Sequence, residues 1–289
     1  MNNMFDIEQE IEIFKRSLKS KSQNTIYNYG ITVHQFLTWI VENSYEHIFE
    51  DEVDREEIEA IAEEYKGELF SSYNYEIKTI NCKFDGINAY FKHKNIDCHI
   101  NREKIQAQTF INDMLSNEEL KAIALCAKEN GDYRTYAFVH SFFYTGARIS
   151  ELLQLKVRDL SKNEVMVKGK GGKYRKLFIP NKLKNILIEY SENYRKDTNA
   201  VSLFTGERGA ITRSTVNKDL DRYFKILEYD EEKKLTPHVI RHIFTKNLMS
   251  KGVSISAIKQ LLGHSLTTTD IYGQLSKKEL MDILENLDF

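Results

Sequence analysis

The sequence predicts a mainly α-helical protein built from two domains. Its 289 residues are about twice the modal length of one domain. Most segments repeat apolar residues at helical spacing, and proline, which interrupts helices, occurs only at Pro180 and Pro237. The one convincing β signal is a pair of short segments in the second half of the chain. We therefore expect an N-terminal helical bundle and a mixed, mostly helical second domain with a small antiparallel hairpin.

Two helices are predicted in the N-terminal domain. Residues 22–41 and residues 75–93 each place apolar side chains on one helical stripe, so the two segments can pack against each other. Residues 97–112 are polar and have no helical period, and Ser116 with Glu119 then forms a capping box that begins the next helix. We place the boundary in this polar segment, which gives domains of residues 1–108 and 109–289.

The formal net charge of −2 averages two unlike halves. Residues 1–112 carry 12 Lys and Arg against 20 Asp and Glu, a net charge of −8, whereas residues 113–289 carry a net charge of +6. Much of the acid lies in residues 50–64, a pattern typical of a solvated loop and helix face. Residues 13–41 contain no acidic residue at all. One surface of the acidic half can therefore still face a polyanion.

Composition also limits where the protein works. No apolar run approaches the ~18 residues of a membrane span. The N-terminus has neither the basic nor the apolar part of a secretion signal, and the three cysteines are scattered without a C-x-x-C motif. We expect a protein of the reducing cytoplasm with no membrane segment.

The predicted hairpin joins residues 164–168 to residues 174–179 through a glycine-rich turn. Glycine permits the positive φ of a tight turn, and we expect the basic side chains of Lys170, Lys173 and Arg175 to project from its tip. A phosphate-binding loop is a possible alternative. The turn lacks the G-x-x-x-x-G-K-[ST] order and leads into a strand, which disfavours that interpretation.

An apolar helix is expected to end at Gly146, and the next helix carries Arg148 and Glu151 three positions apart. Two such side chains can be a surface pair that contributes only a few tenths of a kcal/mol. Apolar residues flank them on both sides, which favours partial burial. A buried guanidinium needs a partner.

Another helix starts at Thr236, with Pro237 in its first position. His238 and Arg241 share a face at the positively polarised end of this helix, where anions are favoured. His238 and His242 also have the spacing of a zinc-binding helix. Val239 stands where the general-base glutamate would be and no third ligand is evident, so we do not expect a metal.

A third segment ends a helix at Gly263, leaves His264 beyond it, and places three threonines before Tyr272. Taken alone, the tyrosine is most simply a packing residue and the histidine a surface residue.

In this order the segments resemble the tyrosine recombinase family of phage integrases and Xer proteins, over nearly the whole chain. The motifs are T-G-x-R-x-S-E-L at residues 145–152, G-K-G at 169–171, H-x-x-R at 238–241, L-G-H at 262–264 and T-T-x-x-Y at 268–272. The interval from His264 to Tyr272 is 8 positions, one fewer than the family usually shows. The resemblance implies a two-domain DNA clamp, with an N-terminal, SAM-like core-binding bundle and a C-terminal catalytic domain.

The resemblance also implies a reaction, site-specific DNA cutting and rejoining through a 3′-phosphotyrosine link. The implied catalytic residues are Arg148, Lys170, His238, Arg241, His264 and Tyr272, with Glu151 holding Arg148 in place. These residue types suit the chemistry, because two guanidiniums can clamp the non-bridging oxygens of a pentacoordinate phosphate while tyrosine attacks. The link conserves the energy of the ester, so we expect no metal and no nucleotide cofactor.

Several polar residues are candidates for gripping double-stranded DNA. Phosphate contacts provide affinity, and the two N-terminal helices, the hairpin and the segment 208–218 each offer basic or amide side chains. The candidates are Lys21, Asn24, Thr25, Lys78, Asn81, Lys83, Lys173, Arg175, Arg213 and Lys218. By the same resemblance we expect paired DNA sites, a homotetramer on DNA, a possible monomer in free solution, and association with the nucleoid of a prokaryotic cell.

The C-terminal residues 276–287 combine a capping box with an apolar stripe, which predicts an amphipathic helix. This helix can pack on its own domain or on a neighbouring protomer in a DNA-bound tetramer. Two other functions also remain open: a catalytically silent DNA-binding or architectural protein, and strand relaxation like that of a type IB topoisomerase. The residues that make up the motifs favour the recombinase over both alternatives.

Overall fold

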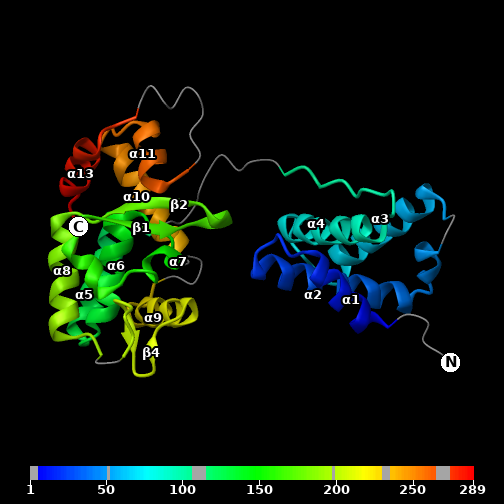
Figure 1. The fold of residues 1–289 in the computed structure, drawn as a ribbon, viewed down its shortest axis with the longest axis horizontal. Helices are drawn as coiled ribbons and strands as arrows, with labels where there is room; N and C mark the ends of the chain where they lie inside the picture. Colours follow the sequence, from blue (N-terminus) through cyan, green and yellow to red (C-terminus); the bar gives the residue numbers. More distant parts are fainter. Residues whose placement is uncertain (1–5, 51–52, 106–114, 197–198, 230–234, 265–273) are drawn as a thin grey trace. The chain divides into compact units, whose positions relative to one another are not determined.

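The computed structural model describes the chain except for residues 1–5, 51–52, 106–114, 197–198, 230–234 and 265–273, and it does not describe the side chains of Lys170 and His238. The chain divides into two compact units, Met1–Thr109 and Phe110–Phe289 (Figure 1). The boundary predicted near residue 108 falls in a segment outside the described residues.

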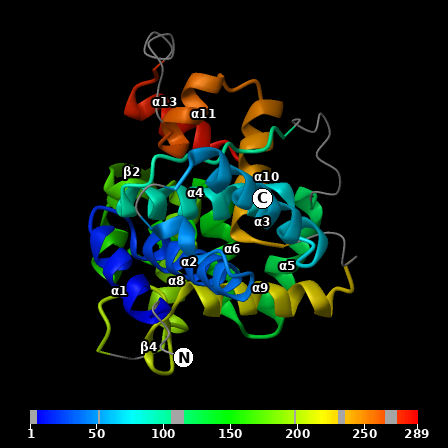
Figure 2. The ribbon, with the colours of Figure 1, turned by 90° about the vertical axis from the view of Figure 1, so that its right-hand side faces the viewer.

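The N-terminal unit is a bundle of α-helices (Figures 1 and 2). Its described elements are α1 (Ile7–Ser17), α2 (Gln23–Glu42), the short 3-10 helix η1 (Glu46–Phe49), α3 (Arg55–Ser71) and α4 (Ile77–Lys94). The two expected helices are α2 and α4. Helix α1 was not predicted, and the acidic residues 50–64, which run into α3, were expected to form a solvated loop and helix face. In α3 the acidic residues alternate with a buried stripe, Ile58, Ile61, Tyr65 and Leu69.

Two asparagines of α4 bind the backbone of residues 100–103, the segment that follows this helix. Asn88 exchanges two hydrogen bonds with the backbone of Ile100, at 2.9 and 2.8 Å, and Asn81 does the same with Glu103, at 3.0 and 2.8 Å. Each side-chain amide thereby pairs a backbone N–H and C=O as a neighbouring strand would. This part of α4 holds residues 100–103 against the bundle.

The second unit, Phe110–Phe289, is built around the buried helix α6. Its helices are α5 (Asn117–Glu129), α6 (Tyr133–Thr145), α7 (Ile149–Leu152), η2 (Val157–Ser161), α8 (Asn181–Asn193), α9 (Arg213–Ile226), α10 (Pro237–Ser250), α11 (Ile255–Leu262) and α13 (Lys277–Glu285). Helices α5, α8, α9 and α10 pack on α6. The capping box predicted at Ser116 and Glu119 begins α5, with hydrogen bonds of 2.8 and 3.1 Å.

The expected antiparallel hairpin is formed by β1 (Glu164–Lys168) and β2 (Tyr174–Phe178). Glu164 pairs with Phe178 and Lys168 with Tyr174, and the turn contains η3 (Lys170–Gly172), in which Gly171 and Gly172 have φ of 71° and 77°. A second, smaller hairpin pairs β3 (Thr205–Gly206) with β4 (Gly209–Ala210). Both sheets are small, so this unit is mainly helical, as predicted.

Helix α13 packs on its own unit in this chain. Leu280, Leu284 and Leu287 are buried in the same core as α6 and α10. The C-terminal Phe289 ring lies 4.3 Å from that of Phe143 and 4.5 Å from that of His140. Of the two packing modes considered for this helix, the single chain therefore adopts the intramolecular one. Within the described ranges, no helix is long and apolar enough to cross a membrane.

Candidate active site

The first arginine motif lies where α6 gives way to α7. Gly146 ends α6 with φ 55°, and a Cβ there would lie 2.4 Å from a ring carbon of Phe244. Only glycine fits both the positive φ and the close approach of the ring. Arg148 follows as the N-cap of α7, and its backbone N–H donates to Oε2 of Glu151 at 2.7 Å. The tight turn thus brings the arginine next to the carboxylate three residues later.

Glu151 is a completely buried carboxylate that accepts hydrogen bonds from two arginines. Its Oε1 accepts from Nη1 of Arg148 at 3.1 Å. It also accepts from Arg175, through Nε to Oε1 at 3.1 Å and Nη2 to Oε2 at 2.8 Å. Burial alone would raise the pKa of Glu151, but the hydrogen bonds and charges of the two arginines outweigh it, and the pKa is lowered. The carboxylate therefore stays ionised.

Arg175 corrects one expectation of the sequence analysis. It was placed among DNA-contacting residues at a projecting hairpin tip, whereas its side chain is only 10% exposed and turns inward from β2. Besides Glu151 it reaches the end of α11, where Nη1 donates to the carbonyl of Leu261 at 2.7 Å. An alternating strand has two faces, and the register of β2 puts this residue on the inner one.

Arg241 joins the same cluster from the first turns of α10. Thr236 caps that helix by accepting from the N–H of Val239 at 3.3 Å, as predicted. The guanidinium of Arg241 donates through Nη1 to the carbonyl of Gly146 at 2.5 Å and through Nη2 to that of Leu262 at 2.8 Å. Burial, together with the charges of Arg148 and Arg175, lowers the pKa of Arg241 to about 10, so it remains cationic at neutral pH.

His264 stands at the exposed edge of the arginine cluster. Gly263 ends α11 with φ 65°, as predicted, and directs the next residue out of the helix. Nε2 of His264 lies 3.1 Å from Nη2 of Arg241. Arginine can only donate, so this nitrogen accepts and the ring is neutral, with its proton on Nδ1. Burial, followed by the charge of Arg241, lowers the pKa of His264, which favours the same neutral state.

The described residues bring four of the seven predicted catalytic side chains together: Arg148, Glu151, Arg241 and His264. Lys170 lies in η3 at the tip of the hairpin and His238 lies in the first turn of α10. Tyr272 falls outside the described residues. The place of Arg175 in this cluster was not predicted, because in the sequence Arg175 is only a basic residue on an alternating strand beside a lysine-bearing turn.

The candidate DNA-contacting residues divide into exposed and buried ones. Asn81 is occupied by its hydrogen bonds to Glu103, and Lys83 donates to Oε1 of Gln35 and lies 4.7 Å from the ring centre of Tyr75. Both are only 8% exposed, and burial lowers the pKa of Lys83. Placing these two on a DNA-facing surface was therefore wrong. The exposed or half-exposed candidates are Lys21, Asn24, Thr25, Lys78, Lys173, Arg213 and Lys218.

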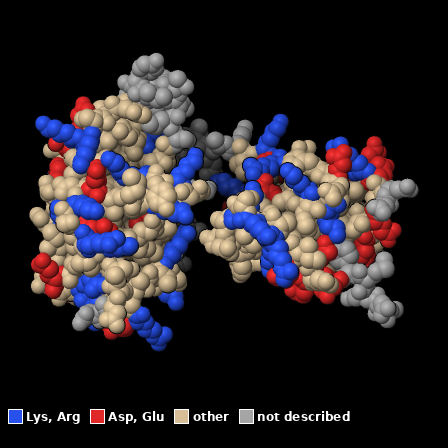
Figure 3. Space-filling model, viewed as in Figure 1, with Lys and Arg blue, Asp and Glu red and all other residues tan. Residues whose placement is uncertain are grey.

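Charge is distributed differently on the two units. On the face in view in Figure 3, Lys and Arg are spread over the surface of the second unit, while many of the Asp and Glu of the N-terminal unit gather toward the right-hand side of the picture. This agrees with the opposite net charges of the two halves of the sequence.

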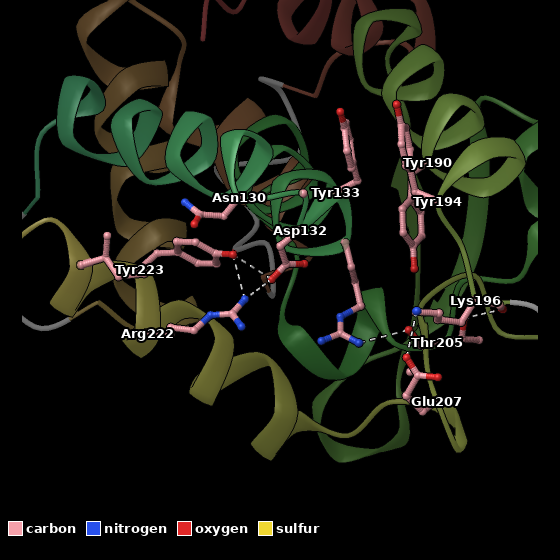
Figure 4. Close-up of a pocket in the computed structure, with 14 residues that line it drawn as sticks. Asn130, Asp132, Tyr133, Tyr190, Tyr194, Lys196, Thr205, Glu207, Arg222 and Tyr223 are labelled. Carbon is pink, nitrogen blue, oxygen red and sulfur yellow. Dashed lines mark hydrogen bonds and ion pairs between the residues drawn. The ribbon is translucent and has the colours of Figure 1, made fainter.

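A separate cleft of about 560 Å³ lies at the junction of α5, α6, α8 and α9. Its charged residues largely satisfy one another: Arg222 pairs with Asp132, and Lys196 lies 2.9 Å from Glu207 (Figure 4). It contains none of the motif residues. The cleft is thus distinct from the arginine cluster, where two guanidiniums share one carboxylate.

The helical fold and the arginine cluster together define a class of protein, a mainly helical one with a cationic site suited to an anion. Residues 113–279 match the model of the Phage integrase family, more than half of the chain. The chain belongs to this family, whose tyrosine recombinases cut and rejoin DNA, and it is an enzyme of that kind.

Individual relatives agree with this membership over almost the full length. Tyrosine recombinase XerA of Pyrococcus furiosus is 30% identical over 93% of this chain and 89% of its own. A tyrosine recombinase of Thermosipho africanus is 25% identical over 97% of this chain and 100% of its own. Among solved structures, XerH site-specific recombinase bound to palindromic difH substrate, in a post-cleavage complex, has the same fold, with a TM-score of 0.65 and 20% identity over 96% of this chain and 83% of that one.

Proposed function

We propose that the chain is a site-specific recombinase that cuts DNA by forming a 3′-phosphotyrosine link through Tyr272. The observation that carries the proposal is the charge balance of the described cluster. Arg148, Arg175 and Arg241 surround one carboxylate, and His264 is neutral, so the cluster has an excess of two positive charges. Such an excess at a largely buried position suits a bound anion.

In this proposal the two motif arginines bind the scissile phosphate. As the phosphorus becomes pentacoordinate, negative charge increases on its non-bridging oxygens, and fixed guanidiniums stabilise that state more than the ground state. Arg148 is about one-third exposed, so part of its guanidinium is open to a ligand. Arg241 is fixed by two carbonyls, which limits the reorganisation needed during the reaction.

The proton transfers involve the remaining predicted residues. The phenol of Tyr272 attacks phosphorus and loses its proton to a neighbouring base, for which His238 is the candidate. His264 accepts from Arg241 at Nε2, so its role is to donate a hydrogen bond from Nδ1 to a non-bridging oxygen. The bond from phosphorus to the 5′ oxygen breaks, and Lys170 supplies the proton that this oxygen needs. The 5′-hydroxyl of a partner strand then attacks the link, releases Tyr272 and completes the exchange.

We further propose that both units contact the DNA and that the active assembly is a homotetramer on two paired sites. Exposed basic residues at the starts of α2 and α9, among them Lys21, Arg213 and Lys218, support the DNA contact. One related structure is described as a lambda integrase tetramer bound to a Holliday junction, which supports the tetramer by analogy.

A covalent-adduct assay tests the mechanism. The protein is incubated in EDTA with a nicked duplex carrying the site recovered by binding-site selection, and the product is resolved on a denaturing gel. We expect a protein–DNA adduct that Tyr272→Phe abolishes. Tyr174→Phe, at a tyrosine of β2 that is 67% exposed, is the matched control and should form the adduct normally. An adduct that survives Tyr272→Phe, or that requires a divalent metal, would contradict the proposal.

A further inference from the structure

We infer that Arg175 is a positioning residue that couples three parts of the active site to one another. These parts are the turn that carries Arg148, the hairpin turn that carries Lys170, and the end of α11 that leads to His264. The inference rests on the proposed function, because it concerns how that site is assembled.

The first link runs through Glu151. Arg175 binds both oxygens of this carboxylate side by side, Nε to Oε1 at 3.1 Å and Nη2 to Oε2 at 2.8 Å. This forked geometry fixes the plane of the carboxylate. The same two oxygens hold the backbone N–H and the Nη1 of Arg148. The orientation of Arg148 therefore depends on Arg175 through Glu151, the carboxylate that both guanidiniums bind.

The second link reaches α11. The remaining donor of the fork, Nη1, binds the carbonyl of Leu261 at 2.7 Å, while Arg241 binds the next carbonyl, Leu262, at 2.8 Å. The stem of Arg175 passes directly over Gly263, where a Cβ would lie only 2.2 Å from its Cδ. Gly263 is therefore required by this contact as well as by its positive φ. Two arginines thus fix the end of the helix from which His264 emerges.

The third link is the hairpin itself. Arg175 pairs with Val167 across the hairpin, and the turn is closed by the N–H of Gly169 donating to the carbonyl of Lys173 at 2.7 Å. A Cβ at Gly169 would lie 3.2 Å from Oε1 of Glu151, so the residue before Lys170 rests against the same carboxylate. The position of the lysine-bearing turn is consequently set by the Arg175–Glu151 pair.

Direct phosphate binding is the competing role for Arg175. Its side chain is only 10% exposed, and three of its nitrogens already donate to protein acceptors, which disfavours that role. The two roles differ in a measurable way. Removing a phosphate contact weakens DNA binding and reduces the slope of log Kd against log salt concentration by about one, whereas removing a positioning residue leaves that slope unchanged.

The test compares Arg175→Ala, Arg175→Lys and the control Lys176→Ala in the full chain. Lys176 is the next residue of β2, is exposed, and pairs with Glu164 outside the cluster. Single-turnover adduct formation and the salt dependence of DNA binding are measured for each. We expect both Arg175 variants to form the adduct about 100-fold more slowly, since small displacements of catalytic groups have effects of that size. Their salt slope and that of Lys176→Ala should match the wild type.

A further variant keeps the test decisive if the Arg175 variants fail to fold. Gly263→Ala keeps the guanidinium but displaces it, and we expect it to slow the adduct in the same way, with no additional effect when combined with Arg175→Lys. Arg175→Lys at the wild-type rate, or a salt slope reduced by about one, would overturn the inference. Failure of the wild-type protein to form any adduct would instead refute the proposed function.

Discussion

The arginines of the active-site cluster are held differently from two arginines at the surface of the N-terminal unit. In the N-terminal unit Arg55 and Arg102 each have a carboxylate of their own at the surface, Glu59 at 2.8 Å and Asp85 at 2.6 Å. In the catalytic unit Arg148 and Arg175 share the buried Glu151. Each arginine of the first group is neutralised by its own carboxylate, whereas the second group has one carboxylate for two guanidiniums and keeps a net positive charge.

Burial is the physical difference between the two arrangements. An exposed pair gains little from its attraction, because water and salt screen it and two mobile side chains must be ordered. A buried carboxylate has already lost its hydration, and its partners are what make it tolerable there. Removing one member of the buried cluster should therefore be far more damaging than breaking a surface pair.

The largest expected effect is that of Glu151→Ala. It leaves two guanidiniums without their carboxylate, and we expect the catalytic unit to lose about 3–5 kcal/mol of its free energy of unfolding. The single tryptophan, Trp39, is buried in the N-terminal unit, so its fluorescence follows that unit while far-UV circular dichroism follows both. In urea, the circular dichroism transition should move to lower concentration and the Trp39 transition should not.

Glu151→Gln is the matched control, because the amide keeps the shape of the side chain and one carbonyl acceptor. It should destabilise less than Glu151→Ala. If Glu151→Ala shifts neither transition, or shifts both equally, the buried carboxylate does not stabilise the catalytic unit in particular, and the contrast between the units fails.

The same contrast separates what the sequence predicted from what it did not. Helices α2, α4, α5 and α10 follow from local signals, apolar period and caps, and the structure has all four. For the acidic residues 50–64 a solvated loop and helix face was expected, and α3 has such a face, but the opposite, buried face of this helix was not predicted. The misassignment of Lys83 has the same origin: a lysine on a helix is usually solvated, and nothing local shows that Gln35, 48 residues away, will cover it.

The candidate site shows the same limit. Arg148, Arg241 and His264 are recognisable from short motifs, because each lies beside its own glycine or helix cap. The role of Arg175 depends on contacts 24 and 86 residues away in sequence, with Glu151 and Leu261. Strand alternation offers two faces for this residue, and only the packing of the hairpin on α7 and α11 selects between them.

The next largest effect concerns acid stability of the catalytic unit through His140. This residue of α6 is 7% exposed and its Nδ1 lies 2.9 Å from the carbonyl of Tyr136, so the neutral ring donates there. Burial lowers its pKa to about 4. Between about pH 6.5 and pH 4 the unfolded chain binds a proton that the folded chain excludes. The titration of His140 therefore leaves the free energy of unfolding unaffected above pH 6.5 and lowers it by roughly 3 kcal/mol as the pH falls to 4.

His140→Phe removes this titration and keeps a ring beside Phe289. In urea unfolding followed by circular dichroism, its stability should vary less between pH 7 and pH 4 than that of the wild type, while the Trp39 transition keeps the same pH dependence in both proteins. An unchanged pH dependence in the variant would show that other groups cause the acid sensitivity of this unit.

The smallest effect is expected for Arg102 and Asp85, and it is the most informative about the cause of the contrast. Arg102 binds Asp85 through Nε to Oδ1 at 2.9 Å and Nη2 to Oδ2 at 2.6 Å, the same side-by-side fork that Arg175 makes with Glu151. The arginine is 65% exposed here and 10% exposed there. Geometry is thus nearly constant between the two pairs while burial changes.

A double-mutant cycle on each pair, with alanine substitutions and urea unfolding, isolates the pairwise coupling. For Arg102 and Asp85, followed by Trp39 fluorescence, we expect no coupling beyond the error of the curves, because screening cancels what the fork provides. For Arg175 and Glu151, followed by circular dichroism, the coupling should be plainly measurable. Equal couplings in the two cycles would mean that the fork geometry, and not burial, determines how strongly this protein holds its arginines.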